Sequence, residues 1–314
     1  MLRKHTRRAV KAAFAVALGV ALLLGLSTPG AQSAGPTVSL GTKNFTEVYI
    51  LGQLYKQALE AKGYKVSYHE NIGSTEITDA ALTSGKINFY SEYTGIIVSV
   101  IGHVNAPQKS AQATYLKAKS IEAKRGFTLF NKTPFYDVDA MGVPTATAKK
   151  YGLHTVADLK KVPGLSICAF PEFQTRYSGL VGLKQAYGIA KVKFVPLAGI
   201  DVYSAMNAAK CKVGDVFTTD PQLLTGPAPA GKPGSHGKYT VLSDPKDIFG
   251  FQNSVPVVSK KLASSLGSKF RKTVDAVSAL LTLKAMGSMN KAVGIDKQSP
   301  KAVASAFLKA NGLK

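Results

Sequence analysis

The sequence predicts an α/β protein made of two lobes of similar construction. Patterns typical of strands and helices alternate along the chain, which indicates mainly parallel sheets covered on both faces. The same order of patterns returns in the second half, so two similar lobes are expected. About 280 residues follow a predicted export signal, which is enough for two lobes of ordinary domain size.

The first 33 residues predict a secretory signal. A basic start is followed by an apolar run at 12–26, too short to span a membrane comfortably, and by small residues at 31–33 that suit cleavage. Ordinary Sec export is the first expectation, and Arg7 with Arg8 leaves twin-arginine export open. We therefore expect an exported protein that is periplasmic or associated with the cell envelope.

The first half begins with a predicted strand, helix and strand. The strands are expected at 38–40 and 65–68, and apolar residues at helical spacing predict the helix between them. Asn44 and Glu47 resemble a capping box at the start of this helix.

The segment at 71–96 predicts one wall of a ligand cleft. Gly73 can adopt backbone angles that other residues resist. Ser74 is placed to cap the next helix, and Gly85 is placed to end it. A predicted strand then delivers Tyr93 to the cleft. The alternative is a helix and strand of an ordinary α/β core, with the tyrosines as packing.

The second half repeats this order of elements. Thr155 and Asp158 are predicted to cap a helix, and strands are expected at 165–169 and 192–195. The run at 226–237, rich in glycine and proline, predicts an exposed loop with a solvated histidine.

The end of the chain predicts three amphipathic helices from Lys260 onward. Phe270, Val274 and Val277 form one apolar stripe at helical spacing. We expect these helices to pack against the first lobe.

The sequence has two cysteines, Cys168 and Cys211. An even number of cysteines in an exported protein favours a disulfide. One cysteine lies in a predicted strand and the other ends a predicted helix, so the two are expected to meet at the edge of one sheet. Two separate buried thiols are the alternative.

The chain is strongly basic, with 40 Lys and Arg against 18 Asp and Glu. Without the basic residues of the export signal, 35 basic and 18 acidic residues remain, a net charge of about +17. Nucleic acid is not the expected partner, because the chain carries an export signal and its lysines are scattered instead of clustered with aromatics. Attraction to an anionic cell envelope is expected, and simple solvation is the alternative.

The sequence lacks the residue sets that catalysis needs. It has no GxSxG elbow, no metal-binding histidine spacing, no reactive cysteine context and no glycine-rich phosphate loop. Asp137 and Asp139 would emerge on one side of one strand, whereas glycoside hydrolysis needs carboxyls on both sides of the bond. We therefore expect no enzymatic activity, no cofactor and no metal.

Five short motifs give the chain a resemblance to a known family. They are GTKNFTE at 41–47, GSTEI at 73–77, EYTG at 92–95, PEFQTR at 171–176 and VFTTD at 216–220. In order and spacing they resemble the osmoprotectant-binding proteins of ABC importers, which capture glycine betaine, choline, carnitine and similar quaternary amines outside the cell. The resemblance covers nearly all of the chain after about residue 36.

The resemblance implies the fold of type II periplasmic binding proteins, in which the chain crosses twice between two lobes. The crossings are expected near 137–143 and 248–255, as a hinge of two strands. Residues 34–138 and 250–314 would then form lobe I, and residues 139–249 would form lobe II.

The resemblance also implies an aromatic cage. A quaternary ammonium has no hydrogen to donate, so its pocket uses aromatic faces and negative groups. Tyr93, Phe217 and Phe251 match cage positions, with core packing as the alternative for the phenylalanines. Asp139 stands where relatives have a further cage tyrosine, and Asp137 matches an acidic position of the family. The alternative for both is a hinge strand whose carboxylates meet lysines or water.

Three further residues are expected to contact a ligand carboxylate. Lys43 and Arg176 match basic positions of the family, and the planar guanidinium suits that anion. Thr75 adds a hydroxyl, and a surface ion pair is the alternative for Lys43. Ile96 replaces an expected threonine. The pocket is therefore expected to suit choline, or a ligand with a second cationic or donor group, better than a betaine.

Together these features predict a monomeric extracytoplasmic binding protein. It is expected to close around a small amine and to be recognised by a membrane permease with its ATPase. The alternative is a ligand-sensing or adhesion module with the same fold that feeds no transporter.

Overall fold

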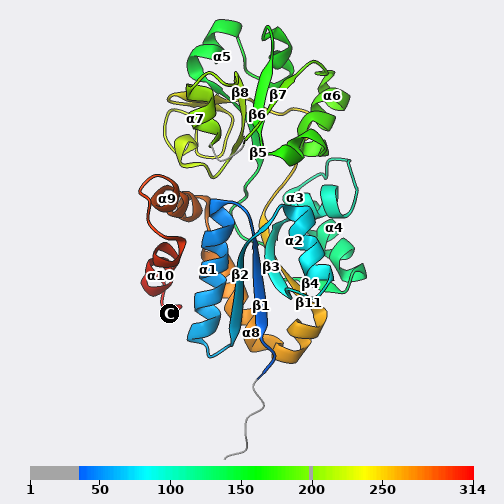
Figure 1. Cartoon of the computed structure of the whole chain (residues 1–314), viewed down its shortest axis with the longest axis vertical. Helices are drawn as coiled ribbons and strands as arrows, with labels where there is room; N and C mark the ends of the chain where they lie inside the picture. Colours follow the sequence, from blue (N-terminus) through cyan, green and yellow to red (C-terminus); the bar gives the residue numbers. More distant parts are fainter. Residues whose placement is uncertain (1–34, 198–200) are drawn as a thin grey trace, which may run out of the picture. The chain divides into compact units, whose positions relative to one another are not determined.

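The computed structural model describes residues 35–197 and 201–314, so the predicted export signal at 1–33 lies outside the described residues. The described chain forms two β-sheets with helices on their faces (Figure 1). The first sheet has the strand order β2-β1-β3-β11-β4, and the second has the order β7-β6-β8-β5-β10-β9.

The elements have the following bounds. The strands are β1 (Val38–Lys43), β2 (Val66–Gly73), β3 (Phe89–Tyr93), β4 (Phe127–Leu129), β5 (Asp139–Pro144), β6 (Ser166–Ala169), β7 (Lys193–Pro196), β8 (Val213–Phe217), β9 (Gly234–His236), β10 (Tyr239–Val241) and β11 (Ser254–Ser259). The helices are α1 (Thr46–Ala61), α2 (Thr75–Thr83), α3 (Thr94–Ile96), α4 (Ala111–Lys124), α5 (Thr145–Tyr151), α6 (Gly182–Tyr187), α7 (Val202–Asn207), α8 (Lys260–Leu280), α9 (Leu283–Gly294) and α10 (Pro300–Ala310). Short helical turns are η1 (Ile97–Ile101), η2 (Val156–Lys161), η3 (Pro171–Gln174), η4 (Tyr177–Val181) and η5 (Pro221–Leu223).

Both sheets are mixed, whereas the sequence patterns predict mainly parallel ones. β1 pairs in parallel with β2 and β3, and β6 pairs in parallel with β7 and β8. The strand by which the chain enters each sheet after crossing from the other runs antiparallel to its neighbours: β11 runs against β3 and β4, and β5 runs against β8 and β10. β9 and β10 form a further antiparallel pair. Tyr136 and Asn253 form an antiparallel bridge. The outgoing and returning segments therefore lie side by side.

Two main apolar cores cover the sheets. The core of the first sheet is built with α1 and the C-terminal helices α8, α9 and α10, and it buries the predicted stripe of Phe270, Val274 and Val277. The core of the second sheet includes Leu159 and Leu183 from the helical segments that cover it. The C-terminal helices thus pack on the first sheet, as their apolar stripes predict.

Several local signals have the conformations that the sequence predicts. Gly73 has a φ of 150° and Gly85 a φ of 77°, both in the region that favours glycine. Thr155 and Asp158 form a capping box at the start of η2. Ser74 is the N-cap residue of α2, but its hydroxyl donates a hydrogen bond to Glu76 and does not accept one from the helix.

Two local predictions are wrong. No side chain caps the start of α1, so Asn44 and Glu47 form no capping box, and Glu47 is buried. The run at 226–237 is not wholly an exposed loop, because β9 at its end pairs with β10. His236 is only 2% exposed, and its Nε2 lies 2.8 Å from a backbone carbonyl oxygen.

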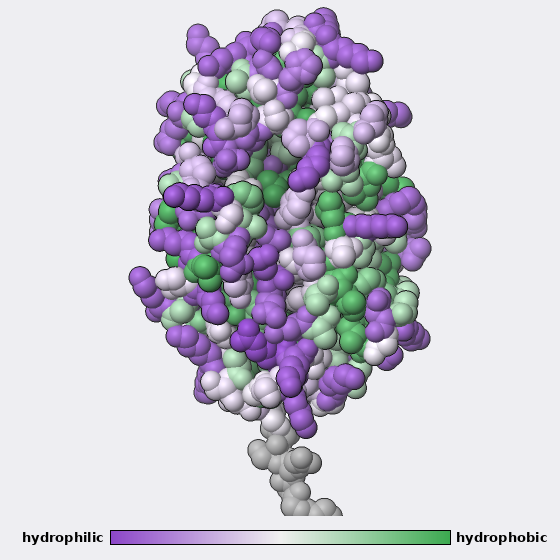
Figure 2. All heavy atoms as spheres, turned by 180° about the vertical axis from the view of Figure 1, so that it is seen from behind, coloured by the Kyte–Doolittle hydropathy of each residue, from purple (hydrophilic) through white to green (hydrophobic). Residues whose placement is uncertain are grey.

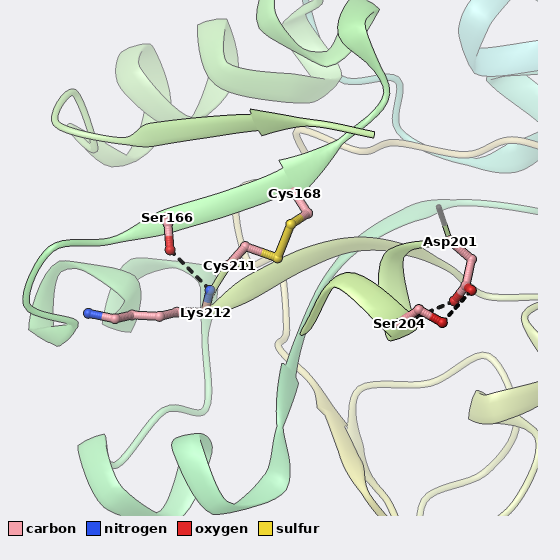
Figure 3. Close-up of a disulfide and its surroundings, with 6 residues drawn as sticks. All are labelled: Ser166, Cys168, Asp201, Ser204, Cys211 and Lys212. Carbon is pink, nitrogen blue, oxygen red and sulfur yellow. Dashed lines mark hydrogen bonds between the residues drawn. A yellow bond between two sulfur atoms is a disulfide. The ribbon is translucent and has the colours of Figure 1, made fainter. Parts of the chain in front are cut away.

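Cys168 and Cys211 form a disulfide in the second sheet (Figure 3). Cys168 lies in β6, and Cys211 lies just before β8, the strand that pairs with β6. Beside the bond, the backbone N–H of Lys212 donates to the hydroxyl of Ser166 at 3.1 Å. The disulfide therefore ties two neighbouring strands together.

In the view of Figure 2, hydrophilic side chains are spread over the surface, and apolar ones lie among them, mostly on the right. The large apolar side chains exposed in the described part of the chain are Ile77, Leu116 and Ile295, which lie on separate segments. Within residues 35–197 and 201–314, no helix combines the length and the apolar character that a membrane crossing requires.

Candidate functional site

A cavity lies between the carboxyl ends of β1 and β3 in the first sheet and of β8 in the second. Its volume of about 60 Å³, at roughly 10–15 Å³ per water molecule, leaves room for a small solute and not for a peptide. All residues predicted for the ligand site line it, with the exception of Phe251. They are Lys43, Thr75, Tyr93, Asp137, Asp139, Arg176 and Phe217.

Three aromatic rings form one wall of the cavity. The ring centroid of Phe45 lies 6.2 Å from that of Tyr93 and 6.4 Å from that of Phe217, with interplanar angles of 23° and 7°. Tyr93 ends β3 of the first sheet, Phe45 lies between β1 of that sheet and α1, and Phe217 ends β8 of the second sheet. The stack therefore spans both sides of the cavity. Phe45 is not among the predicted site residues, although it lies in the first family motif, two residues after Lys43.

Phe251 lies outside this cavity, contrary to the cage position that the resemblance implies. It lines a separate hollow beside the crossing segments, together with Gly95 and Phe249. Its backbone carbonyl accepts a hydrogen bond from the Thr94 hydroxyl at 3.1 Å, which holds this turn against the start of α3. Phe45 supplies the third ring instead.

Lys43 forms a buried ion pair. Its side chain is paired with Glu92, which also accepts hydrogen bonds from the Thr75 hydroxyl at 3.0 Å and the Tyr93 backbone N–H at 2.8 Å. The ammonium lies 4.6 Å from the ring centroid of Tyr93 and 5.4 Å from that of Phe45. The lysine therefore contacts two rings of the wall, and its charge is already balanced.

The hydroxyl of Tyr93 reaches past the cavity to the buried Glu47. It donates a hydrogen bond at 2.7 Å, and Asn290 donates another to the same carboxyl at 2.8 Å. Burial raises the pKa of Glu47 above its ordinary value, and these hydrogen bonds oppose that rise. Tyr93 thus links the aromatic wall to the packing between the first sheet and α9.

Carboxyl groups line the cavity beside the rings, and Asp139 pairs with Phe217 across β5 and β8. Asp137, Asp139, Glu172 and Asp215 line the cavity. The Thr219 hydroxyl donates to Asp137 and the Gln252 amide donates to Asp139, both at 2.8 Å. Burial raises the pKa of Asp137, Asp139 and Asp215 above the ordinary value. Across the described residues, no three such side chains converge as ligands of a metal.

Arg176 connects the two sides of the cavity. Its guanidinium donates to both carboxylate oxygens of Glu76 on α2, at 3.1–3.4 Å. The side chain of Glu76 is 48% exposed and that of Arg176 is 16% exposed. Because this ion pair is partly solvated, it contributes little to stability, but it joins the second sheet to the first.

The free protein should lose stability as the pH rises from about 4.5 to 7, because several buried acids bind protons more tightly in the folded chain. Burial raises the pKa of Glu122 to about 7 and that of Asp220 to about 6. A group with a raised folded pKa stabilises the fold fully below its unfolded pKa, and this contribution is lost as the pH passes through the folded pKa. For Glu122 alone it amounts to about 3 kcal/mol.

Thermal unfolding of the ligand-free protein at about pH 5 and about pH 7.5 tests this expectation, and the midpoint should be higher at pH 5. Glu122→Gln should reduce the difference, whereas Glu60→Gln, an exposed change on α1, should not. Asp158 has the opposite effect on stability, because Lys161 lowers its pKa. Its contribution is lost only as the pH falls below about 4, outside this window. A midpoint that rises with pH across this window would contradict the prediction.

The chain matches one family model and is similar to several binding proteins of known sequence or structure. The family model described as "Substrate binding domain of ABC-type glycine betaine transport system" matches residues 36–310. A glycine-betaine-binding protein of Pseudomonas aeruginosa is 30% identical over 302 residues, with 92% of each chain covered. The glycine betaine-binding protein YehZ of Escherichia coli is 27% identical, with 93% of this chain and 95% of the relative covered. The crystal structure of a glycine betaine/carnitine/choline ABC transporter has a TM-score of 0.67 at 24% identity, over 88% of this chain and 99% of that one.

Proposed function

The chain belongs to the family of substrate-binding domains of ABC-type glycine betaine transport systems, and on this basis we propose that it captures a quaternary ammonium or related amine and delivers it to an ABC importer. The family consists of substrate-binding proteins and not of enzymes. Its relatives act in extracytoplasmic transport, which supports a place outside the cytoplasm for this chain.

The aromatic wall is the observation that carries the ligand assignment. Phe45, Tyr93 and Phe217 offer ring faces to a small cavity that also contains Asp137 and Asp139. A quaternary ammonium makes no hydrogen bonds of its own, and each well-placed ring stabilises it by roughly 0.5–2 kcal/mol. The carboxyl groups supply the opposite charge in a poorly hydrated space. The site therefore suits an organic cation.

Closure of two lobes around the ligand is the proposed mechanism. We assign residues 34–138 and 250–314 to lobe I and residues 139–249 to lobe II, with the crossing segments as hinge. The ion pair of Arg176 with Glu76 and the hydrogen bond of Gln252 with Asp139 join the two sides and support such a closed form. We propose that the protein acts as a monomer.

Titration calorimetry of the mature protein tests the assignment. Among choline, glycine betaine, carnitine and a betaine derived from arginine or histidine, one ligand should bind with a Kd in the micromolar range or below. Phe217→Ala should weaken that ligand about tenfold through loss of one ring contact. Phe307→Ala on α10, outside the cavity, serves as control and should leave the affinity unchanged. If no ligand of the panel binds, the amine assignment is wrong.

A further inference from the structure

The cavity is lined by four acidic and two basic side chains, although the chain as a whole is strongly basic. Its two cationic side chains, Lys43 and Arg176, are each paired with an acid outside the lining, namely Glu92 and Glu76. None of the four acids of the lining forms an ion pair within the described residues, although the charge of Arg176 acts on Asp139 and Asp215. A cation that enters the cavity would therefore meet carboxyl groups that lack an ion-pair partner.

Asp215 is the most unusual of these acids. It is 4% exposed, its Oδ1 has no hydrogen-bond partner in the part of the chain that the structure describes, and it lines the cavity. Its charged neighbours are three further acids, Asp139, Asp220 and Glu172, and one cation, Arg176. Buried polar groups in native proteins are nearly always hydrogen-bonded, so a carboxyl with an unpaired oxygen, in a residue that lines a ligand cavity, indicates a partner from the ligand.

The strand places Asp215 beside the aromatic wall. Side chains two residues apart in a strand share one face of the sheet, so Asp215 and Phe217 of β8 point to the same side, roughly 7 Å apart along the strand. A ligand with its ammonium at the rings and a chain of three carbons can thus present a second group to the carboxyl.

We propose that Asp215 forms a donor subsite, and that the preferred ligand carries a second hydrogen-bonding cationic group on a short chain from its quaternary ammonium. This inference rests on the proposed function and narrows its ligand class. A protonated amine satisfies the buried carboxyl with a charge-assisted hydrogen bond, which is stronger than a bond from a neutral hydroxyl. A ligand carboxylate is not required, because the cations that would hold it are already paired.

Three ligands of the same size test the subsite. They are (3-aminopropyl)trimethylammonium, (3-hydroxypropyl)trimethylammonium and butyltrimethylammonium, which differ only in the terminal ammonium, hydroxyl or methyl group. In calorimetry at neutral pH, the amine should bind the wild type at least about tenfold more tightly than the methyl compound, with the hydroxyl compound between them. Equal or tighter binding of the methyl compound would overturn the inference.

Asp215→Asn separates the subsite from the rest of the cavity. The variant should lose most of the advantage of the amine, measured as the ratio of its affinity to that of butyltrimethylammonium. Asp296→Asn makes the same charge change at an exposed site after α9 and should alter none of the three affinities. Persistence of the advantage in Asp215→Asn would show that another group binds the amine.

The outcomes also separate this inference from the proposed function. If the methyl compound or a betaine binds without preference for the amine, the cavity takes quaternary ammonium ions but Asp215 is no subsite. If no quaternary ammonium compound binds at all, both proposals fail. Since the ranking of the three ligands uses the wild-type protein, it does not depend on whether a variant folds.

Discussion

Replacement of Lys43 by methionine should lower the free energy of unfolding by about 3–5 kcal/mol, because it removes one partner of a buried ion pair. Lys43 is 5% exposed and Glu92 is fully buried. The remaining hydrogen bonds to Glu92, from Thr75 and the backbone of Tyr93, cannot neutralise its charge. The carboxyl would either stay ionised without a counterion or take up a proton, and both cost stability.

Urea unfolding of matched variants measures this cost. The double variant Lys43→Met with Glu92→Gln should recover most of the loss, since a well-packed neutral pair avoids the buried charge. Lys56→Met, which breaks an exposed ion pair with Glu60 on α1, should cost less than about 1 kcal/mol. A loss for Lys43→Met as small as that of the control would mean that Glu92 needs no counterion.

The same double variant distinguishes two roles for Lys43. If the lysine contacts a ligand carboxylate, as the family resemblance implies, the double variant should bind choline but lose affinity for betaines. The structure favours a role in holding Glu92 and the rings, because the ammonium already has a carboxylate and two aromatic faces around it. We therefore expect the double variant to change its affinity for choline and for betaines by a similar factor, or not at all.

The sequence predicts those features of the fold that depend on local preferences. Gly73 and Gly85 have positive φ angles where a turn requires them, and the C-terminal helices bury the stripe that their spacing marks. Thr155 and Asp158 cap η2 because both partners lie within one turn. In each case the interacting residues are a few positions apart, so the pattern itself contains the information.

The site depends on contacts between distant parts of the chain, and these were harder to predict. Lys43 and Glu92 are 49 positions apart, and no local pattern marks Glu92 as the partner. Phe45 belongs to the aromatic wall because its ring stacks on that of Phe217, which comes from the second sheet. Phe251 lies in a turn that is held against the start of α3, and it lines another hollow. A signal for Asp215 was present, because an aspartate inside the apolar strand pattern of VGDVF is unexpected in a buried strand.

Removal of the disulfide, by Cys168→Ala with Cys211→Ala, should lower the free energy of unfolding by about 4 kcal/mol, which is the loop-closure entropy for a separation of 43 residues. Both cysteines are buried among apolar side chains that include Val202 and Met206. Alanine keeps this environment apolar, so the loss should come mainly from the freed chain. Urea unfolding of the oxidised wild type and of the double variant provides the measurement.

Reduction of the wild type supplies the control for this prediction. A reductant should destabilise the wild type by nearly as much as the double substitution does and should leave the double variant unchanged. If the double variant is as stable as the oxidised wild type, the bond does not restrict the unfolded chain. Because the bond ties β6 to the start of β8, while Asp215 and Phe217 lie farther along β8, folded variant protein should bind its ligand normally at low temperature. Its binding should then fail at a lower temperature than that of the wild type.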